Sequence, residues 1–146
     1  MTIDRQGTGL AVLRIAIGVF FIFEGIGKLG WLGSSARLAA QLTDWSASAP
    51  PGSISAWYLH RVALPGVTYF ARLVPLGELT SGLALVLGLW TPLFAFIAFF
   101  MALNFQIAGG AVFKYSFLTS GYGLPVLGAT LALAIGGVRL PWSIRS

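Results

Sequence analysis

Several charged and polar residues interrupt the long apolar stretches of this 146-residue chain, and their types could carry protons or bind a ligand. Glu24 lies within RIAIGVFFIFEGIGK, four residues before Lys28, and Glu78 follows Arg72 by six residues. Residues four apart share a helix face and residues six apart do not, so we expect Glu24 to face Lys28. Arg72 should pair across helices, for example with Glu24. A carboxylate in hydrocarbon costs about 3 kcal/mol on insertion scales, so each needs a partner.

The composition indicates an integral membrane protein. The sequence is 57% hydrophobic and 9% charged, with a mean hydropathy of +0.86, whereas soluble domains contain about a quarter charged residues. The net charge is +5, but the cations are scattered among apolar runs and form no basic stripe of the kind that nucleic-acid binding requires. We therefore expect the lipid bilayer, and no nucleic acid, as a partner.

The residue inventory excludes several kinds of redox and hydrolytic chemistry. The chain contains no cysteine, which excludes thiol–disulfide exchange and cysteine-held iron–sulfur or zinc centres. The single histidine, His60, cannot supply both axial ligands of a haem. No metal-binding motif, nucleophile elbow or phosphate loop occurs, so we expect no metal and no covalently bound cofactor. Electron chemistry would need a bound organic cofactor, such as a quinone, or a partner subunit.

Four apolar stretches are long enough to span the hydrocarbon core, which takes about 20 helical residues. The predicted fold is an all-α integral membrane protein, a four-transmembrane-helix bundle in a single domain covering residues 1–146. Its first connection, 31–69, should be interfacial and partly helical, because SSARLAAQLTDW has the pattern of a short amphipathic helix. The predicted spans are about 9–30, 70–90, 92–111 and 121–138.

This topology brings the polar residues to one depth. Four spans place both termini on one side of the membrane, and the weak bias in cationic residues favours the cytoplasm for that side. With 1.5 Å of rise per residue, Glu24, Glu78 and Asn104 would lie roughly 7–12 Å below the side that carries the long connection. Because these residues share one depth on neighbouring helices, we expect a polar cluster there, which either lines a functional pocket or fixes the register of the helices. Its members would be Glu24, Lys28, Arg72, Glu78 and Asn104.

Two further features concern contacts outside this cluster. Arg14 lies near the opposite side of the membrane, where its long side chain should reach lipid headgroups or a partner protein. Small residues recur along three of the spans and should permit close helix packing. These residues are Gly18, Gly25 and Gly27 on the first span, Gly77, Ser81 and Gly82 on the second, and Gly128, Ala132 and Gly136 on the fourth.

Three of these stretches resemble the DoxX family of small four-helix membrane proteins. LRIAIGVFFIFEGIGKLG is similar to the first span of the family, VPLGELTSGLALVLGLWTPLFA to its second, and MALNFQIAGG to its third. The long first connection looks more like the DoxD branch, the larger membrane subunit of thiosulfate:quinone oxidoreductase. The family pattern maps onto Arg14, Gly25, Lys28, Glu78, Gly82 and Asn104.

The resemblance implies a membrane subunit of an oxidoreductase complex, and we expect it in a bacterial or archaeal cytoplasmic membrane. Other membrane-complex subunits would be its partners, and a quinone or another lipophilic molecule would bind at the polar cluster. Whether the chain is itself an enzyme stays open, because activity would depend on a second subunit. The alternatives are a non-catalytic accessory subunit of a larger respiratory or photosynthetic complex, and a small transporter or channel.

Overall fold

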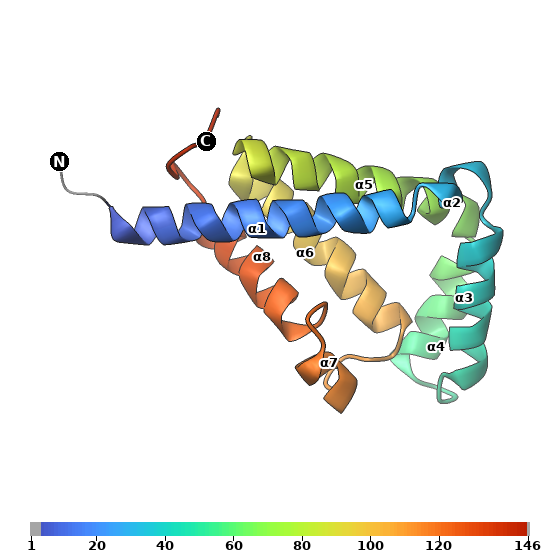
Figure 1. The fold of residues 1–146 in the computed structure, drawn as a ribbon. Coiled ribbons are helices and arrows are strands. Elements are labelled where there is room, and N and C mark those ends of the chain that lie inside the picture. Colours follow the sequence, from blue (N-terminus) through green and yellow to red (C-terminus); the bar gives the residue numbers. More distant parts are fainter. Residues whose placement is uncertain (1–3, 146) are drawn as a thin grey trace.

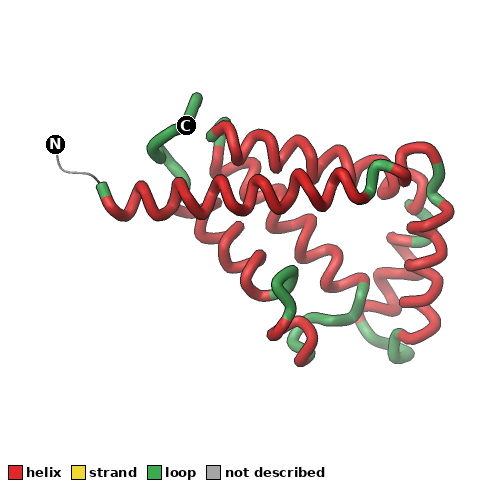
Figure 2. Tube along the Cα trace, in the orientation of Figure 1, coloured by secondary structure: helices red, strands yellow, loops and turns green. Residues whose placement is uncertain are grey.

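A computed structural model describes residues 4–145, and most of these residues are helical (Figures 1 and 2). Within this part of the chain, three helices are long and apolar enough to cross a membrane. They are α1 (Arg5–Gly27), α5 (Val67–Leu87) and α6 (Thr91–Ala108). Each begins and ends within a few residues of a predicted span. The protein is therefore an all-helical integral membrane protein, as its composition indicates.

The fourth predicted span contains a shorter helix. The structure gives α8 (Leu124–Gly136), whose 13 residues extend about 20 Å at 1.5 Å per residue. A hydrocarbon core of about 30 Å is longer than this. The helix ends early because Gly123 precedes it in a non-helical conformation and Gly137 follows it as the C-cap. α8 packs mainly against α6 and to a lesser extent against α1.

The long first connection folds into a helical cap. It contains α2 (Gly30–Gly33), α3 (Ala36–Ser48), α4 (Ile54–Tyr58) and the π-helix η1 (Leu59–Ala63), which confirms that the connection is partly helical. We refer to residues 30–63 as the cap. In Figure 1, α3 and α4 run across the end of the molecule that is furthest from the start of α1. Leu38 and Leu42, which lie four residues apart within SSARLAAQLTDW and so share one face of α3, are both buried there.

α1 and α5 approach each other closely enough for their backbones to touch. A Cβ atom on Gly18 would lie 2.8 Å from the carbonyl oxygen of Gly82, and a Cβ on Gly82 would lie 2.7 Å from that of Gly18. Further along, Gly25 packs against Leu79, mainly against its side chain. Small residues at these positions let the helices meet along their length, and this contact brings the end of α1 alongside the first half of α5.

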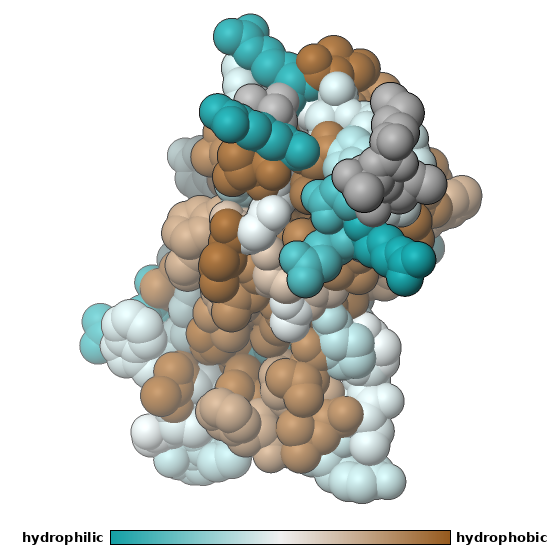
Figure 3. Space-filling model, turned by 90° about the vertical axis from the view of Figure 1, so that its left-hand side faces the viewer, coloured by the Kyte–Doolittle hydropathy of each residue, from teal (hydrophilic) through white to brown (hydrophobic). Residues whose placement is uncertain are grey.

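The outer surface is largely apolar. Figure 3, seen from the end where α1 begins, shows hydrophobic side chains over most of that face, with hydrophilic groups gathered near the chain ends. Large apolar side chains are also exposed elsewhere, among them Phe23, Leu73, Phe96, Phe100 and Ile135. Such a surface suits a lipid environment, because a soluble protein rarely exposes extended apolar patches.

Candidate functional site

One lysine joins two carboxylates at the end of α1. Lys28 Nζ donates to Glu24 Oε2 at 2.7 Å and to both carboxylate oxygens of Glu78 at 2.9 Å. The Glu24 side chain is 36% exposed, that of Lys28 is 14% exposed, and that of Glu78 is fully buried. The prediction that Glu24 faces Lys28 is confirmed. The ion pair across helices connects Lys28 with Glu78.

Each member of this triad is positioned by a separate feature of the sequence. Glu24 and Lys28 lie one turn apart, with the glutamate nearer the N-terminus, which is the favourable order for a helical ion pair. Lys28 is the C-cap of α1, so its side chain leaves the helix at the point where the chain turns into the cap. Glu78 projects from the face of α5 that packs against α1, where Gly25 and Leu79 hold the two helices together.

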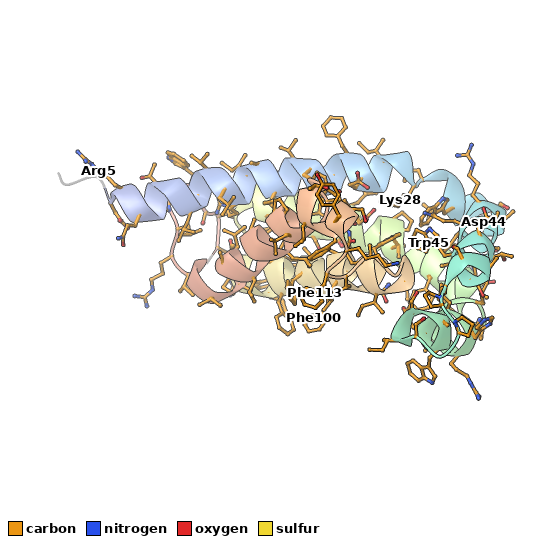
Figure 4. The ribbon with its side chains drawn as sticks, turned by 90° about the horizontal axis from the view of Figure 1, so that it is seen from below. Arg5, Lys28, Asp44, Trp45, Phe100 and Phe113 are labelled. Carbon is orange, nitrogen blue, oxygen red and sulfur yellow. The ribbon has the colours of Figure 1, made fainter. Side chains whose placement is uncertain are left out.

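The triad borders a cleft of about 420 Å³ between α1, the cap and α6. Lys28 Nζ lies 5.4 Å from the centre of the Phe105 ring and 6.0 Å from that of Trp31. Lys28 and Trp45 line the same cleft, and Figure 4 labels them in the region where α1 leads into the cap. The cleft is lined by Glu24, Lys28, Trp31, Gln41, Trp45, Phe105, Gln106, Gly109, Ala111 and Tyr122. It therefore combines acid–base groups with several aromatic rings.

Tyr122 closes the cleft from the connection that precedes α8. Its hydroxyl makes a long hydrogen bond of 3.5 Å to Glu78 Oε1, and Gln106 Nε2 donates to its backbone carbonyl at 3.3 Å. A phenol keeps its proton at neutral pH, so the Tyr122 hydroxyl can donate a hydrogen bond.

The remaining two members of the predicted cluster lie elsewhere. Arg72 is exposed on α5 and borders a separate pocket beside Trp31 and Ser34. The expected pairing of Glu24 with Arg72 is wrong, because within residues 4–145 Lys28 takes both carboxylates. Asn104 is half-buried on α6, where its side-chain oxygen accepts a hydrogen bond from the Tyr58 hydroxyl. The predicted five-residue cluster is therefore a three-residue triad and two separate residues.

Sequence reasoning missed the aromatic lining of the cleft. Trp31 follows Lys28 by three residues, Phe105 follows Asn104 directly, and Trp45 ends the predicted amphipathic motif. Their proximity to the charged residues was the available signal. Aromatic residues are common in membrane proteins, however, and their positions alone do not distinguish a ligand pocket from an interfacial belt.

The side chains around the cleft can be compared with the donor sets of known kinds of site. In the part of the chain that the structure describes, there is no group of three or more His, Cys, Asp or Glu residues that could hold a metal. A cleft of a few hundred Å³ with aromatic walls and a few polar groups is instead typical of small-molecule sites. The cleft has room for a flat ring and offers Glu24, Gln41 and Tyr122 as polar contacts.

Arg14 requires a correction. Sequence reasoning placed it near lipid headgroups or a partner protein, but its side chain is fully buried. Its guanidinium donates to the carbonyl of Trp142 at 2.9 Å and to the hydroxyl of Ser143. The C-terminal segment 142–145 is itself hydrogen-bonded to the α5–α6 turn, with Trp90 N donating to the Arg145 carbonyl at 2.8 Å. The two terminal nitrogens of the Arg14 guanidinium find acceptors within the protein, whereas its buried Nε atom has none. The side chain is therefore held inside the fold and does not extend to the membrane surface.

Arg14→Met is expected to loosen the C-terminal segment. The substitution preserves an apolar stem of similar length but removes the donors to Trp142 and Ser143, and losing charged hydrogen bonds of this kind costs about 1.5–3 kcal/mol. Digestion with a carboxypeptidase should then remove the C-terminal residues faster than in the unmodified protein. Arg139→Met, which alters an exposed arginine shortly before this segment, is the matched control. Equal digestion rates for the two variants would contradict the assigned role of Arg14.

The fold and the cleft define a small helical membrane protein with a charged triad and an aromatic-lined cleft at one end of its spans. Residues 9–111 match the DoxX family. Because this match covers more than half of the chain, the protein belongs to the DoxX family, a membrane family often linked to oxidoreductase-related subunits. The matched residues include the whole triad, whereas Tyr122 lies beyond them. No curated protein and no solved structure gives a match.

Proposed function

We propose that this protein is the membrane subunit of an oxidoreductase complex and that it binds a quinone, or a similar lipophilic ring, in the cleft beside Lys28. The observation that carries the proposal is the placement of the Glu24–Lys28–Glu78 triad in the wall of an aromatic-lined cleft of about 420 Å³. A quinone supplies two-electron, two-proton chemistry when bound. The electrons would come from a partner subunit, since the chain contains no cysteine and only one histidine.

The residues of the triad have distinct roles in this proposal. The ammonium of Lys28 is directed at the two carboxylates, so it acts as a fixed positive charge that holds them together. Glu24 is the proton-exchanging group of the cleft, because it is partly exposed and only one of its oxygens binds Lys28. Glu78 is fully buried and shares the lysine with Glu24, so a change in the protonation of one carboxylate alters the other electrostatically.

The walls of the cleft fit a flat ring. Trp31, Trp45 and Phe105 offer ring faces and edges for stacking. The Tyr122 hydroxyl, which keeps its proton, can donate to a carbonyl oxygen of the ligand if it leaves its long bond to Glu78. A molecule that combines an apolar ring with a hydrogen-bonding oxygen meets both kinds of contact.

Glu78→Gln tests this function in the complex obtained by mild detergent extraction. The substitution keeps the side-chain volume but removes one of the two negative charges that share Lys28. Because this alters the protonation of Glu24, the proton-exchanging group, quinone reduction should fall about 100-fold, the scale of a disturbed acid–base contribution. Asp44→Asn on α3 alters an exposed carboxylate away from the cleft and is the control. Quinone binding and turnover that both match the unmodified complex would exclude the proposed role of the triad.

Three finer assignments belong to the same proposal. α8, together with the segment that precedes it, would complete a four-helix membrane bundle, which is supported by its packing against α6 and α1. The long connection that forms the cap supports the DoxD branch. The start of α1 and the C-terminal segment lie at the same end of the molecule (Figure 1), which is consistent with both termini facing the cytoplasm.

A non-catalytic accessory subunit is the alternative. The observation that favours it is the exposed aromatic pair on α6, Phe96 and Phe100, which stack edge to face with their ring centres 4.7 Å apart. These side chains could pack against another membrane subunit. In that case Glu78→Gln would leave turnover unchanged, whereas Phe96→Ala together with Phe100→Ala would separate the protein from its complex during purification.

A further inference from the structure

A second cavity lies on the side of α6 that does not face the cleft. It is a groove of about 480 Å³ between α5 and α6. Its lining is apolar apart from Asn104, and its main contributors are Phe70, Leu73, Gly77, Phe96, Phe100 and Met101. A Cβ atom on Gly77 would lie 2.8 Å from the Met101 sulfur, so the glycine keeps space open in the floor of the groove.

A small cavity of about 20 Å³ separates this groove from the Lys28 cleft. It shares Phe70, Val74 and Asn104 with the groove, and it shares Trp45 and Phe105 with the cleft. Such a volume is close to that of a single water molecule. The groove and the cleft are therefore neighbouring spaces divided by one layer of side chains.

The dividing layer is made of two contacts that involve few atoms. One is the hydrogen bond from the Tyr58 hydroxyl to Asn104. The other is the edge-to-face contact of Trp45 with Phe105, whose ring centres are 6.4 Å apart. Trp45 and Phe105 are only half-buried, and side chains with access to open space can change rotamer without movement of the backbone. A chain of methylene width could therefore pass from the cleft to the groove.

We propose that the α5–α6 groove holds the hydrocarbon tail of the lipophilic molecule whose ring occupies the Lys28 cleft. This inference rests on the proposed function and adds to it the class of ligand, a ring that carries a long alkyl or isoprenoid tail. The adjacency of the three spaces, which share lining residues, and the absence of charged side chains from the groove lining support this occupant. An ordinary membrane lipid in the groove is the competing outcome.

The test uses two probes with the purified full chain in lipid nanodiscs. The first is a dimethoxy-methyl-benzoquinone without a tail, whose binding in the cleft is measured by quenching of tryptophan fluorescence. The second is the same ring with an alkyl tail that ends in a diazirine, which is photo-crosslinked and mapped by mass spectrometry. We expect crosslinks on the groove residues of α5 and α6, and we expect an excess of the unlabelled tailed quinone to abolish them.

Gly77→Leu fills the groove and should abolish these crosslinks while the tailless ring still quenches. Gly128→Leu is the matched control, because a Cβ atom there meets nothing within 4 Å on the exposed side of α8. If Gly77→Leu also loses quenching by the tailless ring, Leu73→Trp at the exposed rim of the groove provides a second variant with the same expectation.

The outcomes separate the two proposals. Quenching by the tailless ring with crosslinks outside the groove would overturn the tail assignment and leave ring binding intact. Groove crosslinks that an excess of tailed quinone does not reduce would assign the groove to ordinary lipid and would also overturn it. Failure of both probes to bind would overturn the proposed function itself.

Discussion

Lys28→Met is expected to lower the free energy of unfolding by about 3–5 kcal/mol, the cost of removing one partner from a buried ion pair. The substitution preserves the apolar stem but leaves Glu24 and Glu78 as neighbouring carboxylates without a cation. Glu78 is fully buried, and without the lysine ammonium its remaining contact is the long hydrogen bond from the Tyr122 hydroxyl. Thermal unfolding in detergent, followed by circular dichroism, should show a melting temperature lower by about 10 °C for a chain of this length.

Two further variants isolate the cause of this loss. Arg72→Met removes an exposed cation from α5 and should change the free energy of unfolding by less than about 0.5 kcal/mol, as is usual at the surface. Lys28→Met combined with Glu78→Gln should recover much of the loss, because the buried charge is removed together with its partner. If the Lys28→Met protein has the same melting temperature as the unmodified protein, Lys28 does not hold the two carboxylates together.

The Glu24–Lys28 pair of the triad could be predicted from the sequence because helix geometry determines it directly, whereas the pairing of Lys28 with Glu78 could not. Glu24 and Lys28 are one turn apart, and the rise per residue places Glu78 at their depth. Depth does not specify the direction in which a residue points around its helix. Asn104 lies at a similar depth but lines the groove between α5 and α6, and Arg72 lies on the exposed surface of α5. Direction depends on the packing of the whole bundle, so the sequence pattern could not provide it.

The environment of Arg14 shows a second limit of sequence reasoning. Its partners are a backbone carbonyl and a serine hydroxyl more than a hundred residues away, at Trp142 and Ser143. A backbone carbonyl carries no sequence signature. The segment that supplies it reaches the α5–α6 turn through non-glycine residues with positive φ, Arg139 and Trp142. Positive φ is uncommon in such residues, so the sequence did not indicate this turn.

The glycine patterns illustrate the same distinction and lead to the second strong prediction. Repeated small residues predicted close packing on three spans. The structure places Gly18 and Gly82 at a contact between backbones, whereas Gly128 faces open space. A repeat of small residues therefore allows two helices to approach closely, but it does not determine which helix face packs against another.

Gly82→Leu is expected to separate α1 from α5. Its Cβ atom alone would lie 2.7 Å from both the carbonyl oxygen of Gly18 and the backbone nitrogen of Ile22. Backbone atoms in a helix cannot move aside as a flexible side chain can, so the helices must shift, and overpacking of this kind costs about 3 kcal/mol. The shift would also disturb the alignment of Lys28 with Glu78, which depends on the same helix contact.

Two measurements test Gly82→Leu. Thermal unfolding in detergent reports its loss of stability, and quenching of tryptophan fluorescence by the tailless quinone reports whether the cleft still binds the ring. Gly128→Leu introduces the same side chain at an exposed position of α8 and should leave both measurements close to those of the unmodified protein. Gly82→Ala, which adds only the Cβ, should give an intermediate loss because the first clash already occurs at that atom. If Gly82→Leu and Gly128→Leu are equally stable, the close approach of α1 and α5 does not hold the triad in place, and the alignment of Lys28 with Glu78 must then come from the cap.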